Sequence, residues 1–179
     1  MKQAQKKKTT FDICIIALSV ALITVCSWIS IPVSESVKYT LQLVAVFVCA
    51  GLFGVWRGLA AVAIYTLMGL IGIPVFASFA AGPGATTGFV VGFLPLVLTV
   101  GWIPFMRIRR IWVKYLVWGG MMLVGLLLCY AVGTVWFMLW TGYDFVTAIG
   151  FTVLPYYLFD FVKIAISLVL VERLLKFVP

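Results

Sequence analysis

Long apolar runs, separated by short polar breaks, occupy most of the 179 residues of this chain. A helix of about 20 apolar residues is long enough to cross the hydrocarbon core of a bilayer, which is roughly 30 Å thick. The runs predict six transmembrane helices, over residues 11–31, 40–55, 58–73, 86–106, 112–140 and 146–175. We therefore expect an all-α membrane protein, with a basic tail over residues 1–10 and a single six-helix transmembrane domain over residues 11–179.

The charged residues fix the expected orientation of this domain. Only 10% of the residues are charged, whereas a soluble domain carries about 25%. If the N-terminus lies in the cytoplasm, eleven of the 13 Lys and Arg residues fall in cytoplasmic segments. Lys38 alone falls outside, and Lys163 lies within the sixth run. Cytoplasmic loops are enriched in basic residues, so both termini are expected in the cytoplasm. The net charge of +8 then reflects topology and contacts with lipid head groups, not nucleic-acid binding.

Asp160 and Lys163 are opposite charges placed where lipid should surround the chain. Each costs roughly 2.5–3.5 kcal/mol at the centre of a spanning helix. Their i, i+3 spacing puts them on one helix face, with Tyr156 one turn before Asp160. Two interpretations remain open: an anchor for a ligand, which we favour, and a structural pair that neutralises itself. The predicted topology places the pair on the outer side of mid-membrane, in a pocket that residues 32–39 and 74–88 would cover.

Residues 74–84 form a break unlike the others, because they combine apolar residues with two prolines and two glycines. Irregular backbone is tolerated at membrane depth only where it is buried in protein or lines a cavity. The glycine-rich stretch that continues to Gly88 lacks the Lys-Ser/Thr of a phosphate-binding loop, so it predicts a close approach to a ligand or helix instead. The ligand-contacting residues expected from the whole segment are Phe76, Ser78, Gly84, Thr87 and Gly88.

Two further pairs of residues have candidate roles. Thr40 and Gln42, at the start of the second run, supply a hydroxyl and an amide that would either bind a ligand or cap a helix. Ala17 and Ala21 are small residues four apart in the first run, a spacing that lets another helix come close. The aromatic residues, 16% of the chain, are expected mainly to pack in the core and to form interfacial belts.

Several classes of chemistry lack their residues here. The chain has no histidine and only five acidic residues, which argues against haem, zinc, imidazole catalysis and paired-carboxylate catalysis. The four cysteines show no Cys-x-x-Cys spacing, so we interpret them as small buried hydrophobic residues. We therefore expect no enzyme, no metal and no cofactor. No ATP-binding motif is present, so ATP-driven movement of a solute would need a motor from another subunit.

Four stretches together resemble the BioY family, the biotin-specific substrate-binding (S) components of energy-coupling factor (ECF) transporters. They are Val37–Gln42, Gly69–Ala77, Gly84–Phe89 and Leu154–Lys163, and the resemblance extends over about residues 11–176. It implies a six-helix S-component fold in a prokaryotic cell membrane, capture of biotin from outside, and docking to a transmembrane T subunit and two ATPase subunits. By position, Asp160 and Lys163 match the family's ligand-contacting pair.

The resemblance also assigns Ala17 and Ala21 to the face that meets the T subunit. This chain departs from the family pattern at Lys38, which replaces a proline, and at residues 84–89, where Gly-Ala-Thr-Thr-Gly-Phe replaces Gly-Pro-Thr-Gly-Gly-Tyr. Three alternatives remain: the same scaffold binding a different vitamin, a small membrane enzyme acting on lipid, and a self-sufficient oligomeric transporter.

Overall fold

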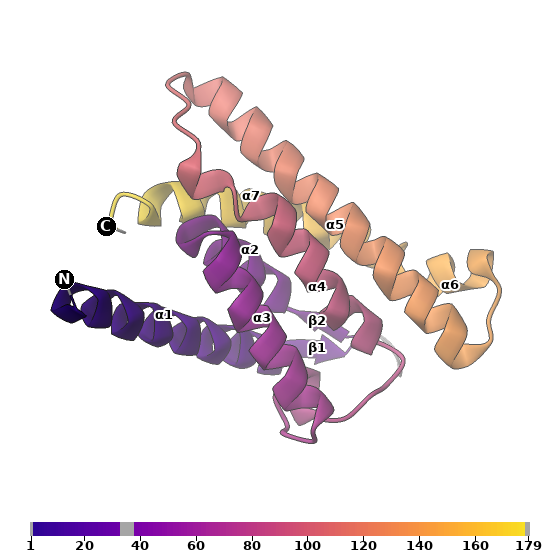
Figure 1. Ribbon diagram of the computed structural model, residues 1–179. Coiled ribbons are helices and arrows are strands. Elements are labelled where there is room, and N and C mark those ends of the chain that lie inside the picture. Colours follow the sequence, from indigo (N-terminus) through magenta and orange to yellow (C-terminus); the bar gives the residue numbers. More distant parts are fainter. Residues whose placement is uncertain (1, 33–37, 178–179) are drawn as a thin grey trace.

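The computed structural model describes residues 2–32 and 38–177. Seven α-helices, two short 3₁₀ helices and one small β-hairpin account for most of these residues (Figure 1). The α-helices are α1 (Lys2–Trp28), α2 (Gln42–Phe53), α3 (Val55–Leu70), α4 (Thr87–Val100), α5 (Ile111–Thr141), α6 (Phe145–Thr152) and α7 (Tyr157–Leu174). The other elements are β1 (Ser30–Pro32), β2 (Lys38–Thr40), η1 (Ala77–Phe79) and η2 (Ile103–Phe105). The expectation of an all-helical architecture is confirmed, with the hairpin as an unpredicted addition.

Three helical segments of the described chain are long and apolar enough to cross a membrane by themselves. They are Thr9–Trp28 in α1, Thr87–Phe105 across α4 and η2, and α5. A bent pair, α6 with α7, qualifies as a fourth. The helices α2 and α3 have 12 and 16 residues, so they are only about 18 and 24 Å long. The protein is thus a multi-pass membrane protein, in which two of the six predicted spans are shorter than the bilayer core.

The sixth predicted span is not one continuous helix. The chain leaves α6 at Thr152 and enters α7 at Tyr157, and the two helix axes differ by 50°. Pro155 explains this break, because proline has no N–H to donate and its ring clashes with the preceding helical turn. The hydroxyl of Tyr39 in β2 donates a hydrogen bond to the carbonyl of Pro155 at this break. The Tyr39 ring also packs edge-on against Tyr156, with 5.0 Å between ring centroids.

The two ends of the first predicted span also differ from expectation. The helix α1 begins at Lys2, so the basic stretch expected as a separate tail over residues 1–10 continues the first helix. At its other end α1 stops at Trp28, and β1 pairs antiparallel with β2, with Ser30 opposite Thr40. The residues that join these strands, 33–37, lie outside the described part of the chain. They are the middle of the segment 32–39 that was expected to cover part of the pocket.

The core forms around α2, which contacts α1, α3, α4 and α7. Ten of its 12 residues are buried, as expected for a short apolar helix in the middle of a bundle. The helices α4 and α5 approach so closely at Gly92 that a β-carbon there would lie 2.9 Å from the carbonyl oxygen of Cys129. Large apolar side chains on the outer faces of the long helices are exposed, for example Leu18, Leu116 and Leu139, which suits contact with lipid.

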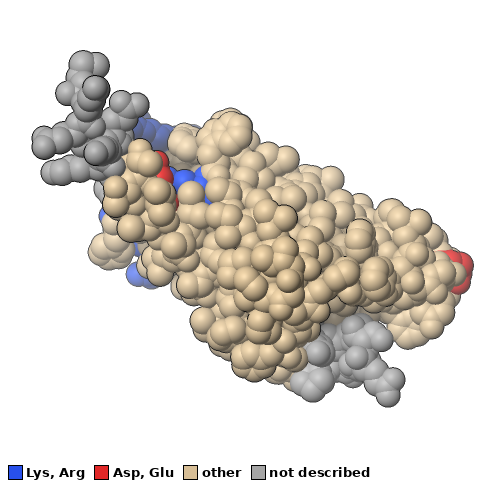
Figure 2. All heavy atoms as spheres, turned by 60° about the horizontal axis from the view of Figure 1, so that its bottom comes forward, with Lys and Arg blue, Asp and Glu red and all other residues tan. Residues whose placement is uncertain are grey.

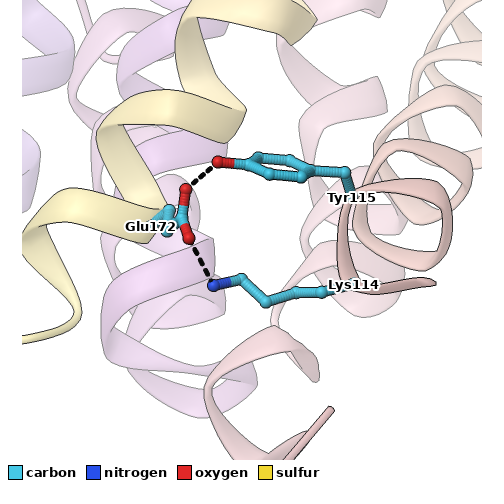
Figure 3. A network of polar contacts seen from close by, with 3 residues as sticks. All are labelled: Lys114, Tyr115 and Glu172. Atoms are coloured by element: carbon cyan, nitrogen blue, oxygen red, sulfur yellow. Dashed lines mark hydrogen bonds and ion pairs between the residues drawn. The ribbon is translucent and has the colours of Figure 1, made fainter. Parts of the chain in front are cut away.

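On the face that Figure 2 shows, charged side chains lie near the ends of the elongated body, and uncharged residues cover its middle. Arg57 at the start of α3 pairs with Asp12 of α1 at 2.6 Å. Glu172 of α7 accepts hydrogen bonds from Tyr115 and from Lys114 of α5, the latter at 2.7 Å (Figure 3). Both contacts join helix ends that the predicted topology places in the cytoplasm.

Asp144 caps the N-terminus of α6, where its carboxylate accepts hydrogen bonds from Thr147. The hydrogen bonds from the Thr147 side chain and backbone hold the pKa of this carboxyl below its usual value. Capping satisfies one of the backbone N–H groups that a helix start leaves without a partner. The cap therefore fixes where α6 begins after the turn at Gly142, whose φ is 76°.

Replacing Gly92 by valine should destabilise the protein. The new side chain would meet the backbone of Cys129 in α5, which cannot move aside as a flexible side chain can. Overpacking of this kind costs about 1–3 kcal/mol, and we expect a lower midpoint of thermal unfolding in detergent. Gly120→Val is the matched control, because nothing lies within 4 Å of a β-carbon at Gly120. Equal midpoints for the two variants would contradict the close packing of α4 on α5.

Candidate functional site

A cavity of about 380 Å³ lies among β2, α2, the 76–87 loop and helices α4 to α7. Binding sites for small molecules in proteins usually have volumes of roughly 300–1,000 Å³. The polar residues in the wall are Thr40, Gln42, Thr86, Thr87, Tyr130, Thr152, Tyr156, Asp160 and Lys163. The aromatic side chains are Phe76, Phe89, Phe93 and Phe137. The wall thus combines a few polar groups with flat apolar surfaces, as is typical of ligand sites.

The Asp160–Lys163 pair belongs to this wall. Asp160 is 4% exposed, and its Oδ1 lies 2.8 Å from the Nζ of Lys163. The two opposite charges form an ion pair at this distance, and Oδ1 has no hydrogen-bond partner among the described residues. Lys163 carries three N–H groups, and Asp160 is its only ionic partner in the described part of the chain. Donors on Lys163 therefore remain for an acceptor on a molecule in the cavity.

Tyr130 of α5 was not predicted as a site residue, yet it donates a hydrogen bond to the Oδ2 of Asp160. It also lines the cavity. In the sequence it is one aromatic residue inside a long apolar run and looks like a packing residue. Its hydroxyl could have indicated a polar role, because a buried tyrosine usually has a hydrogen-bond partner. With Tyr130 and Lys163 on its two oxygens, the buried carboxylate has a partner on each side.

The start of α2 places Thr40 and Gln42 in the cavity wall. The residue that precedes the helix is Leu41, and no side chain caps it, so the alternative of a helix cap at Thr40 or Gln42 is wrong. The Nε2 of Gln42 donates to the hydroxyl of Tyr65 in α3 at 2.9 Å. That hydroxyl in turn donates to the carbonyl of Val75 at 3.0 Å.

The segment after α3 lines the cavity through Phe76, Gly84 and Thr87. The N–H of Gly84 donates to the hydroxyl of Thr87 at 2.8 Å. The carbonyl of the same glycine accepts from the indole N–H of Trp136 in α5 at 3.0 Å. Phe76 packs over Gly69, where a β-carbon would lie 2.0 Å from the ring. These contacts satisfy the irregular backbone and hold the loop against the helices.

Two of the predicted ligand-binding residues do not line the cavity. Ser78 makes a hydrogen bond of 2.8 Å with Ser30 of β1, and its φ of 56° is unusual for a residue other than glycine. Gly88 lies against Trp136, where a β-carbon would be 2.1 Å from the β-carbon of that tryptophan. Ser78 thus ties the loop to β1, and Gly88 allows close packing of α4 on α5.

The far side of the 74–80 loop is attached to the end of α1. The hydroxyl of Ser27 donates to the carbonyl of Val75 at 2.5 Å. The indole N–H of Trp28 donates to the carbonyl of Pro74 at 3.0 Å. The rings of Trp28 and Phe79 lie 4.8 Å apart. The loop is thus held by α1 on one side and by α3 and α5 on the other.

Together these features define a multi-pass membrane protein with a cavity of ligand size, lined by both polar and apolar side chains. Within the described ranges, no group of three His, Cys, Asp or Glu residues is arranged to hold a metal ion. The model of the BioY family matches residues 1–179, and the chain belongs to this family. The resemblance inferred from the four sequence stretches is thereby confirmed, as is a role in transport and not in catalysis.

Similar proteins agree with this assignment. The "Biotin transporter BioY" of Thermotoga maritima is 36% identical over 160 residues, which cover 87% of this chain and 90% of that protein. The "Probable biotin transporter BioY" of Pyrococcus horikoshii is 32% identical over 167 residues, or 91% of this chain and 95% of that protein. The crystal structure of an S-component for biotin from an ECF-type ABC transporter matches with a TM-score of 0.76 at 21% identity. It covers 98% of this chain and 94% of that one, and this likeness shows that the two share a fold.

Tyr130→Phe should lower stability, because it leaves the Oδ2 of the buried Asp160 without its hydrogen-bond donor. An unsatisfied buried acceptor costs about 1–3 kcal/mol, and more when it is charged. Unfolding of the ligand-free protein in detergent would show a lower midpoint. Tyr157→Phe is the control, since that ring is 43% exposed. If Tyr130→Phe unfolds at the same midpoint as the control, the hydrogen bond to Asp160 is not stabilising.

Proposed function

We propose that this chain is the biotin-binding S component of an ECF-type ABC importer in a prokaryotic cell membrane. The observation that carries the proposal is the Asp160–Lys163 pair in the wall of a partly enclosed cavity whose lining is mostly apolar. Membership of the BioY family supports it, as do relatives described as biotin transporters. The S-component for biotin that has the same fold supports it too.

The chemistry of biotin matches the cavity wall. Its ureido ring carries two N–H donors and one carbonyl acceptor, and its valerate chain ends in a carboxylate. Lys163 offers donors to either the carbonyl or the carboxylate, while Asp160 offers an acceptor to an N–H group. The thioether ring and the alkyl chain are apolar and suit the phenylalanine side chains of the wall, such as Phe76, Phe89 and Phe93. Biotin would thus be bound as a ligand, and no cofactor is required.

We infer six passes through the membrane, with both termini in the cytoplasm. The bent pair α6 and α7 counts as one pass, and the short helices α2 and α3 count as one each. This arrangement is supported by the ion pairs Asp12–Arg57 and Lys114–Glu172. Each joins two helix ends that fall on the cytoplasmic side in this topology. The cavity then belongs to the outer half of the membrane, where it receives biotin from outside the cell.

The partners that we propose are a transmembrane T subunit and two ATPase subunits, within the lipid of the membrane. Ala17 and Ala21 are both exposed on α1, beside the exposed Leu18 and Leu22. Small residues on an exposed helix face allow a second helix to pack closely. We therefore propose this face as the contact with the T subunit.

Calorimetry of the purified protein in detergent tests biotin capture directly. The wild type should bind biotin, and both Asp160→Asn and Lys163→Met should bind it more weakly by roughly 2–5 kcal/mol. Each substitution removes one charge of a buried pair and leaves the other without its counter-ion. The unfolding midpoint of each variant shows whether the protein remains folded.

The outcomes of this titration separate the alternatives. A folded wild-type protein that does not bind biotin would refute the proposal, and other vitamins would then be tested as ligands of the same scaffold. Normal binding by both variants would make the Asp160–Lys163 pair structural. The ligand contacts would then have to be sought in the 76–87 loop.

Ala17→Leu combined with Ala21→Leu should separate partner docking from ligand binding. Biotin affinity should stay at the wild-type value, because neither residue lines the cavity. Co-purification with the T and ATPase subunits should be lost, since the larger side chains prevent close helix packing. Ala131→Leu on α5, at another exposed alanine, is the control and should leave the complex intact. A complex retained by the double variant would place the docking face elsewhere.

A further inference from the structure

Tyr65 is completely buried on α3 and lies behind the cavity wall, not in it. Its hydroxyl makes hydrogen bonds with the Nε2 of Gln42 at 2.9 Å and with the carbonyl of Val75 at 3.0 Å. The hydroxyl of Ser27, which donates to the same carbonyl, also lies beside it. Its ring packs edge-on against Phe76, with 5.7 Å between centroids. Nothing in the sequence separates this tyrosine from the packing aromatics around it.

The donor in each of these hydrogen bonds can be assigned by starting from the carbonyl of Val75. A backbone carbonyl has no proton to give, so the hydrogen between Tyr65 and Val75 must be that of the tyrosine hydroxyl. The hydroxyl has then used its single proton and can only accept from Gln42. The amide of Gln42 must therefore turn its nitrogen toward Tyr65. In the opposite orientation Tyr65 could donate to only one of two neighbouring oxygens, so one hydrogen bond of this buried group would be lost, although Ser27 would still donate to Val75.

The orientation of the amide decides what Gln42 offers to a ligand. With Nε2 held by Tyr65, the amide oxygen Oε1 makes no hydrogen bond to any described residue, and Gln42 lines the cavity. An oxygen in this position accepts a hydrogen bond and cannot donate one. The group that it meets must carry an N–H or O–H.

We infer that Tyr65 is a positioning residue that fixes Gln42 as an acceptor and thereby makes this part of the cavity selective for an N–H donor on the ligand. The inference rests on the proposed biotin function. At neutral pH the donors of biotin are its two ureido N–H groups, whereas its carboxylate only accepts. Gln42 therefore contacts the ureido ring.

Tyr65→Phe removes only the hydroxyl and isolates this effect. The ring packing on Phe76 stays, and the carbonyl of Val75 keeps its hydrogen bond from Ser27. The Gln42 amide becomes free to turn either end toward the cavity. Tyr115→Phe is the matched control, because it removes a hydroxyl that bonds to Glu172 of α7, and neither residue lines the cavity.

The experiment measures biotin affinity in the wild type, Tyr65→Phe, Gln42→Met and the double variant. We expect each single variant to bind about tenfold more weakly, the loss of roughly one hydrogen bond. The double variant should bind like Gln42→Met alone, because Tyr65 acts through Gln42. Two further ligands, biotin methylated on one or on the other ureido nitrogen, measure the selectivity for an N–H donor. The preference for biotin over the methylated forms should shrink in Tyr65→Phe.

The results distinguish this inference from the proposed function. Full biotin affinity in Tyr65→Phe would overturn the inference. Tyr65→Phe would also overturn it by lowering biotin affinity equally in the wild type and in Gln42→Met. An unchanged preference for biotin over methylated biotin would do the same, since a purely structural role weakens the binding of all ligands alike. The methylated ligands keep the test decisive even if Gln42→Met does not fold. Failure of the wild type to bind biotin would instead refute the proposed function and this inference with it.

Discussion

The structure depends on enclosing two opposite charges inside an apolar body. Asp160 and Lys163 would each be costly against lipid, and they are tolerated because they face each other across 2.8 Å. Tyr130 completes the arrangement by donating to the second oxygen of the carboxylate. The packing of α5 on α7 is thus required by electrostatics as much as by apolar contact. The same arrangement leaves donors on Lys163 facing the cavity, which links the stability of the helix bundle to its binding chemistry.

A related constraint acts on the backbone. The break before α7 and the 74–84 loop leave carbonyl groups without helical partners, and such groups need a hydrogen-bond donor from elsewhere. Aromatic side chains with a polar tip satisfy these groups. Tyr39, Tyr65, Trp28 and Trp136 donate to carbonyls of Pro155, Val75, Pro74 and Gly84, respectively. A ring that is apolar along its sides and polar at one point can cross the core and still end in a hydrogen bond.

The sequence predicted the features that follow from hydrophobicity and charge. The helices, the Asp160–Lys163 pair and the unusual 74–88 segment could all be identified because each has a local signature in composition. The 50° bend before α7 was missed, although Pro155 was visible, because the apolar run continues through it. Tyr130 and Tyr65 could not be assigned, since their roles depend on which helices meet in space. Ser78 and Gly88 were predicted with the other residues of this segment, but neither lines the cavity.

The attachment of the 74–80 loop to the end of α1 has a mechanical consequence. Ser27, Trp28 and Ser30 each hold one point of this loop by a hydrogen bond, and the next residues of the chain form the cavity wall. Moving the loop alone would break three bonds, at a cost of about 1 kcal/mol each. Moving it together with α1 and β1 keeps these three bonds. Such a movement would still break the bonds from Tyr65 of α3 to Val75 and from Trp136 of α5 to Gly84, so the cavity wall mechanically couples the first helix to the rest of the bundle.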